Sequence, residues 1–121
     1  MARYPGLMLR VLAKDHPAMG PGKAQLVALI DSTGSISAAA REIGMSYRRA
    51  WQLVDALNAS FTEPVVLTAV GGKRGGGAVV TEFGRGLVAR FHAMEDKASA
   101  AIAADVEQFT KHLRRPPGKT R

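Results

Sequence analysis

Residues 46–52, with the sequence SYRRAWQ, carry the side chains of this chain best suited to binding chemistry. An arginine can donate two hydrogen bonds to O6 and N7 of guanine, and an α-helix fits the major groove of DNA. A serine at the start of such a helix can face a phosphate, which the free backbone amides also attract. On the alternative interpretation, the arginines simply occupy a solvated helix face. The candidate DNA contacts here are Ser46, Tyr47, Arg48, Arg49 and Gln52.

The two aromatic residues of this segment have different expected roles. Trp51 could stack on a base, but helical winding places it with Val54 and Leu57, which favours burial in the core. The same winding puts Tyr47 on this side, at the start of the helix. Either its ring packs inside or its hydroxyl reaches a phosphate, and both roles stay open.

The sequence offers no pattern typical of catalysis or of metal binding. His16, His92 and His112 are scattered, and no pair of them has the i, i+4 spacing of a helical zinc site. Cysteine is absent, which excludes thiolate sites and disulfides. The glycine-rich segment over 71–77 lacks the Lys-Ser/Thr pair that completes a phosphate-binding loop. We therefore expect no catalytic residue, no metal ligand, no cofactor and no enzymatic activity.

Short elements must position the arginine-bearing helix. The elements expected before it are a strand over 7–13, a loop over 14–22 and a helix from Pro21 or Lys23 to Ser32. Gly34 should end that helix, and Ser37 should cap a short second helix that ends at Gly44. The third helix runs from Tyr47 to about Ser60. A short helix, a glycine-containing turn and a longer helix together predict a helix-turn-helix.

A β-hairpin is expected next. Residues 65–70 and 78–80 are rich in valine and should form two strands. The loop over 71–77 contains five glycines around Lys73 and Arg74. These two cations either contact phosphates or the minor groove beside the third helix, or they only keep the loop soluble. A hairpin after a helix-turn-helix is typical of a wing.

A long helix capped by Thr81 should close the domain. Its apolar stripe consists of Phe83, Leu87, Phe91, Met94, Ala98, Ile102, Val106, Phe109 and Leu113. A domain this small cannot cover the whole stripe, so we expect the same helix of a second copy to cover its far half. A bend is expected around 97–101.

The predicted fold is therefore mainly α. A winged helix-turn-helix domain spans residues 1–112, with a small β-hairpin wing and a dimerisation helix over 82–112. A basic disordered tail follows over 113–121, where four cations and no acid occur.

Charge and length agree with this organisation. The 121 residues carry a net charge of +7, which favours a polyanionic partner such as nucleic acid. No run of about 18 apolar residues predicts a membrane span. The first residues lack the apolar region of a signal peptide, so we expect a cytoplasmic protein with no membrane partner.

The chain resembles the N-terminal winged-helix domain of ModE-type molybdate-responsive transcriptional regulators. The residues that carry the resemblance are GSISAAAREIGMSYRRAWQLVDALN over 34–58 and GGKRGGGAVVTEFG over 71–84, and the likeness covers roughly residues 7–102. A looser likeness to the helix-turn-helix of LysR-type regulators covers the alanine-rich second helix and residues 81–84. The resemblance implies a homodimer on a palindromic operator. By position it puts Ser37, Ser46, Tyr47, Arg48, Arg49 and Gln52 at the duplex, with Lys73 and Arg74 on the wing.

The resemblance implies a DNA-binding transcriptional regulator connected with molybdenum. Full-length regulators carry molybdate-binding modules after the dimer helix, whereas this sequence ends in a proline-rich basic segment, so we expect that domain to be absent. Two other functions stay open: a winged-helix protein–protein interaction module, or a sensor that binds a small oxyanion such as molybdate at the dimer interface. No anion-binding loop is visible for molybdate apart from the wing.

Overall fold

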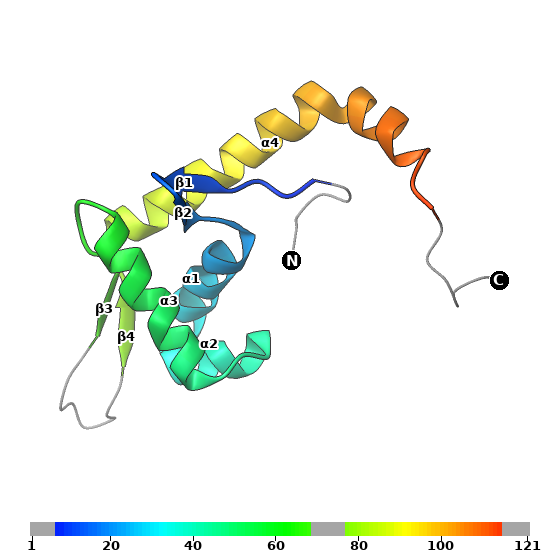
Figure 1. The fold of residues 1–121 in the computed structure, drawn as a ribbon. Helices are drawn as coiled ribbons and strands as arrows, with labels where there is room; N and C mark the ends of the chain where they lie inside the picture. Colours follow the sequence, from blue (N-terminus) through cyan, green and yellow to red (C-terminus); the bar gives the residue numbers. More distant parts are fainter. Residues whose placement is uncertain (1–6, 69–76, 115–121) are drawn as a thin grey trace.

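The structure is a computed structural model that describes residues 7–68 and 77–114 (Figure 1). Its elements are, in chain order, β1 (Val11–Ala13), β2 (His16–Met19), α1 (Pro21–Thr33), α2 (Ile36–Ile43), α3 (Tyr47–Ser60), β3 (Val66–Thr68), β4 (Ala78–Val80) and α4 (Glu82–Thr110). This mainly helical arrangement, with a hairpin after the third helix, is compatible with the predicted winged helix. In the described part of the chain, no helix combines the length and apolarity needed to cross a bilayer.

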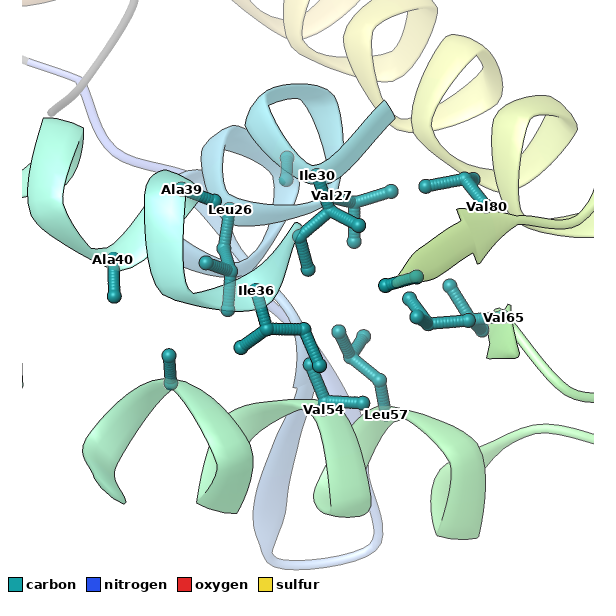
Figure 2. Packing of buried hydrophobic residues seen from close by; sticks show 14 of the residues in the cluster. Leu26, Val27, Ile30, Ile36, Ala39, Ala40, Val54, Leu57, Val65 and Val80 are labelled. Carbon is teal, nitrogen blue, oxygen red and sulfur yellow. The ribbon is translucent and has the colours of Figure 1, made fainter. Parts of the chain in front are cut away.

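The core lies where α1, α2 and α3 meet the β3–β4 hairpin (Figure 2). Each element contributes the apolar face that its periodicity predicts. The largest fully buried side chains are Leu26, Val27, Ile30, Ile36, Val54, Leu57, Val65, Val66 and Val80. Phe91 of α4 also lies in this cluster, so the first half of α4 belongs to the same core.

Alanines set the distance between α2 and α3. Ala39 and Ala40 of α2 and Ala50 of α3 are all fully buried, and Figure 2 shows Ala40 directed toward α3. Such small side chains let two helix backbones approach closely. The burial of Ala39 and Ala40 thus gives the alanine-rich sequence of this helix a packing role. Met45, in the turn between the helices, packs against the core.

Most of the predicted helix ends are confirmed. Gly34 and Gly44 take left-handed conformations, with φ of 71° and 80°, and end α1 and α2. The Ser46 hydroxyl accepts a hydrogen bond of 3.0 Å from the Arg49 amide. The Thr81 hydroxyl accepts one of 2.8 Å from the Gly84 amide.

The prediction that Ser37 caps α2 is wrong. Ser35 is the cap, and its Oγ accepts a 3.0 Å hydrogen bond from the Ala38 amide. Ser35 is held in an extended conformation by an antiparallel bridge to Gly77, which a helical residue could not form. Ile36 is then the first helical residue and is buried. Ser37 consequently lies inside the first turn, with its side chain exposed.

The prediction of a loop over 14–22 is also wrong, because His16–Met19 forms a strand. β2 pairs antiparallel with β1, and the strand expected over 7–13 is shortened to Val11–Ala13. Lys14 makes the tight turn possible by adopting φ of 60°. The proline at position 17 argued against a strand, but a two-stranded ribbon has an open edge where a missing N–H costs little.

The second hairpin pairs β3 with β4 antiparallel. Val66 faces Val80 and Thr68 faces Ala78 across β3 and β4, which confirms the two strands within the described residues. The Ala78 amide donates to the Gly34 carbonyl at 3.0 Å, so β4 also pairs with the turn between α1 and α2. The loop predicted over 71–77 lies outside the described residues, apart from Gly77.

Helix α4 is the longest element, with 29 residues or about 43 Å. It ends at Thr110, close to the expected residue 112. Its one non-helical residue is Ile102, with φ of −118° and ψ of 18°, just beyond the bend expected at 97–101. Past this point the helix projects from the body of the molecule (Figure 1). Phe109 is 72% exposed there, which agrees with the expectation that this domain leaves the far half of the stripe uncovered.

Gly84 lets the start of α4 lie directly on the hairpin. A β-carbon at this position would lie 2.6 Å from the Val65 carbonyl oxygen and 3.1 Å from Val80 Cγ1. A β-carbon at Gly86, two residues later, would meet no atom within 4 Å. The two glycines therefore form a matched pair on one helix.

We expect Gly84→Ala to lower the free energy of unfolding by about 1–3 kcal/mol, because α4 must move away from rigid backbone. Gly86→Ala should raise it by about 0.5–1 kcal/mol, since alanine is the better helix former. Urea unfolding at one protein concentration measures both. An unchanged or higher midpoint for Gly84→Ala would contradict the close contact.

Candidate nucleic-acid interface

Helix α3 has one buried face and one exposed polar face. Ala50, Val54 and Leu57 are fully buried, as the helical winding predicted. The side chains that the winding placed outside are exposed: Arg48, Arg49, Gln52 and Asp55. The core contacts thus hold the backbone of α3 while two cations, an amide and a carboxylate point into solvent.

The start of α3 brings a hydroxyl, an aromatic ring and the arginines together. Ser46 is exposed, and the hydrogen bond that it accepts from Arg49 leaves its own O–H available as a donor. Tyr47 is 52% exposed, so it does not belong to the core face on which winding placed it. Its ring meets the edge of Trp51 at 6.2 Å between centroids. Trp51 is half-buried and packs against the core, which confirms the preference for packing.

Three further DNA contacts were predicted from the sequence. One of them, Ser37, belongs to the described residues. Ser37 is exposed on the first turn of α2, and no described hydrogen bond joins it to the side chains of α3. Lys73 and Arg74 lie outside the described residues. The structure therefore groups Ser46 through Gln52 on one helix and leaves the wing cations untested.

Lys23 is a further cation at this site, and the sequence analysis did not single it out. Its ammonium donates a 2.7 Å hydrogen bond to the Pro17 carbonyl of β2. Burial lowers the pKa of Lys23, and the neighbouring Arg49 guanidinium lowers this pKa further. Nothing local in the sequence could have identified this neighbour, because it depends on the packing of β2 against α3.

Asn58 connects α3 to the hairpin. Its Oδ1 accepts hydrogen bonds from the Val65 and Val66 amides at 2.8 and 3.1 Å, and its Nδ2 donates to the Val66 carbonyl at 2.9 Å. Thr81 closes the other side of the same turn, donating from its hydroxyl to the Pro64 carbonyl at 2.8 Å. These contacts fix the orientation of the hairpin relative to the exposed face of α3.

In the described part of the chain, hollows with mainly apolar walls lie on both sides of α4. The one against α1 has a volume of about 330 Å³, with walls that include Val27 and Val88. At its edge the Arg85 Nε donates to both carboxylate oxygens of Asp31 at 3.2 Å. The other, of about 170 Å³, lies between Met19 and Phe91. Among residues 7–68 and 77–114, no three His, Asp or Glu side chains are grouped so that they could hold a metal ion.

Comparison with known proteins finds relatives of one kind. The chain is 45% identical over 109 residues to the molybdenum-pterin-binding protein MopB of Rhodobacter capsulatus, a match that covers 90% of the chain and 39% of that protein. It is 35% identical over 85 residues to the molybdenum transport protein ModE of Azotobacter vinelandii, covering 70% and 32% respectively. It is 40% identical over 68 residues to the DNA-binding transcriptional dual regulator ModE of Escherichia coli, covering 56% and 26%. No protein-family model matches the chain.

These matches confirm the resemblance stated from the sequence: the chain is a relative of the ModE and Mop proteins. It spans about two fifths of the length of MopB and about a quarter to a third of the ModE proteins. The names of these relatives describe regulation, molybdenum binding and molybdenum transport.

The Asn58 contacts generate a stability prediction. We expect Asn58→Ala to lower the free energy of unfolding by about 1–3 kcal/mol, because the amides of the buried residues Val65 and Val66 lose their acceptor. Asn58→Asp keeps the acceptor for the two amides but sets a carboxylate oxygen against the Val66 carbonyl, so it should also lower the free energy of unfolding. Ser60→Ala is the matched control, since Ser60 bonds only within α3, to the Ala56 carbonyl. Urea unfolding measures the midpoint of each of the three variants. An Asn58→Ala midpoint equal to that of Ser60→Ala would contradict the stabilising role assigned to the Asn58 hydrogen bonds.

Proposed function

We propose that this chain is a DNA-binding transcriptional regulator of the winged helix-turn-helix type. In this proposal α2 and α3 form the helix-turn-helix, α3 enters the major groove, and the β3–β4 hairpin is the wing. Two copies bind a palindromic operator in the cytoplasm. The proposal is supported most directly by the exposed polar face of α3, which carries Arg48, Arg49 and Gln52 while the opposite face is buried.

The residues have distinct roles in this proposal. Arg48, Arg49 and Gln52 approach base edges, since arginine and glutamine can each bond bidentately to a purine. The other contacts, to backbone phosphates, are made by Ser37, Ser46 and Tyr47, and by Lys73 and Arg74 of the wing. Ser37 has the weakest support, because it is not the helix cap that sequence reasoning had made of it.

The relatives support regulation rather than catalysis. The Escherichia coli relative is named a DNA-binding transcriptional dual regulator, and 68 residues of this chain match it. The names of MopB and of the Azotobacter ModE protein connect these relatives with molybdenum. We propose that the genes regulated by this chain are connected with molybdenum. The described hollows have mainly apolar walls and Arg85 is already paired with Asp31, so we assign neither hollow to molybdate.

Homodimerisation is the second part of the proposal, and it is supported by the far half of α4. Ile102 and Phe109 are exposed there, and Leu113 is exposed just past the end of the helix, in a region that no other described element covers. Pairing two such helices would remove these apolar side chains from water. It would also bring together two copies of α3, as a palindromic site requires.

The role of α3 is tested by arginine substitution. Arg48→Ala and Arg49→Ala should each weaken binding by about 1–3 kcal/mol, or about 5- to 160-fold, if a bidentate base contact is lost. Fluorescence anisotropy with a duplex selected from genomic fragments by the wild-type protein measures this. Arg90→Ala, an exposed arginine of α4, removes the same charge and should bind like the wild type. Unchanged affinity in both α3 variants would refute the recognition helix.

The role of α4 is tested by charge substitution. The double variant Val106→Asp/Phe109→Asp puts negative charge on the apolar stripe of α4. We expect it to sediment as a monomer in sedimentation velocity, where the wild-type protein sediments as a dimer. Ala104→Asp/Gln108→Asp places the same charge on the opposite helix face and should leave the dimer intact. A wild-type protein that sediments as a monomer would instead favour a winged-helix module that binds another protein.

A further inference from the structure

We propose that Asp55 is a specificity-determining residue of the DNA-binding surface, and that its carboxylate accepts a hydrogen bond from the N4 amino group of a cytosine in the major groove. This inference rests on the proposed function and extends it to an acidic residue on the same face of α3. It assigns to Asp55 the rejection of most sequences rather than a general gain in affinity.

Asp55 lies in line with two of the side chains proposed to read bases. At 3.6 residues per turn, Arg48, Gln52 and Asp55 fall within about 60° of one another around the axis of α3, and all three are exposed. Asp55 lies about 10 Å beyond Arg48 along this axis, which corresponds to about three base-pair steps. A helix that lies in the major groove therefore presents the three side chains to neighbouring base pairs.

The Asp55 carboxylate has no structural role among the described residues. It takes part in none of the described ion pairs. A carboxylate can also stabilise a helix through a cation three or four residues away, but the residues at those spacings, Trp51, Gln52, Asn58 and Ala59, are uncharged. Nor does it lie in the first turn, where the helix dipole favours a negative charge, because it is the ninth residue of α3.

A carboxylate at this position opposes binding to a duplex of arbitrary sequence. The other charged residues of α3 are Arg48 and Arg49, which the backbone phosphates attract, whereas the same phosphates repel Asp55. Removing a carboxylate from water without a hydrogen-bond donor adds a further cost. Both costs are offset only where the groove presents a donor to Asp55. The residue therefore lowers the affinity for most sequences and spares those with a donor at the right base pair.

The chemistry of the carboxylate selects the base. An ionised aspartate only accepts hydrogen bonds, and the donors in the major groove are the amino groups of cytosine and adenine. Adenine presents the acceptor N7 beside its amino group, which suits an amide such as Gln52, whereas cytosine presents its donor alone. The carboxylate of Asp55 therefore fits cytosine better. On the competing interpretation, Asp55 is a solvated charge that touches no base.

A base-pair substitution scan separates these interpretations. The probe is a duplex selected by the wild-type protein from genomic fragments, with each base pair of one half replaced in turn and the affinity measured by fluorescence anisotropy. Replacing the cytosine read by Asp55 should weaken wild-type binding about 5- to 160-fold. Asp55→Ala should lose this penalty at that one position and keep the penalties elsewhere. Arg48→Ala should keep it, which excludes an arginine that reads the guanine of the same pair.

A duplex of unrelated sequence and equal length provides a second readout. Asp55→Ala and Asp55→Asn should both bind it more tightly than the wild type does, because the repulsion of the phosphates is removed. Glu107→Ala is the matched control, since Glu107 is an exposed acidic residue of α4, and it should leave the penalties unchanged. Thermal melting identifies any variant that fails to fold.

Two results of the scan would overturn this inference, even if Arg48→Ala and Arg49→Ala weaken binding. One is a set of penalties in Asp55→Ala equal to that of the wild type. The other is a penalty lost at a base pair without cytosine. If the wild-type protein binds no duplex, the proposed function itself fails.

Discussion

The close contact of α2 with α3 is the constraint on which the rest of the structure depends. Fully buried alanines, Ala39, Ala40 and Ala50, leave no space between the two helices for larger side chains. Because α3 is seated this closely, its rotation about its own axis is fixed, and so is the set of residues that faces water. The exposure of Arg48 and Arg49 is thus a consequence of packing on the other side of the helix. The polar character of these residues alone would not specify which way the helix is turned.

Polar contacts then attach the remaining elements to this unit. Asn58 of α3 and Thr81 at the start of α4 both form hydrogen bonds with the backbone of the segment from Pro64 to Val66. The hairpin and α4 are consequently anchored at the same short stretch of backbone. Gly84 reinforces this arrangement, because only a residue without a side chain fits against the Val65 carbonyl. The orientation of the projecting helix is therefore coupled to that of α3 through a few hydrogen bonds and one glycine.

The parts of the fold that sequence reasoning predicted correctly are those specified by local chemistry. Glycine caps, the serine and threonine caps of α3 and α4, and the buried face of α3 follow from neighbouring residues alone. The errors occur where a distant segment decides. Ser35 caps α2 because Gly77 holds it extended.

The pattern of ion pairing separates structural cations from those available to a partner. Arg85 joins α4 to α1 through Asp31, so its charge is already used to hold two helices together. Arg48, Arg49 and Lys23 take part in none of the described ion pairs, although all three come from well-packed helices. Burial lowers the pKa of Lys23, and the Arg49 guanidinium lowers this pKa further. In the proposed function, Arg48 and Arg49 are therefore the cations of α3 available to a polyanion.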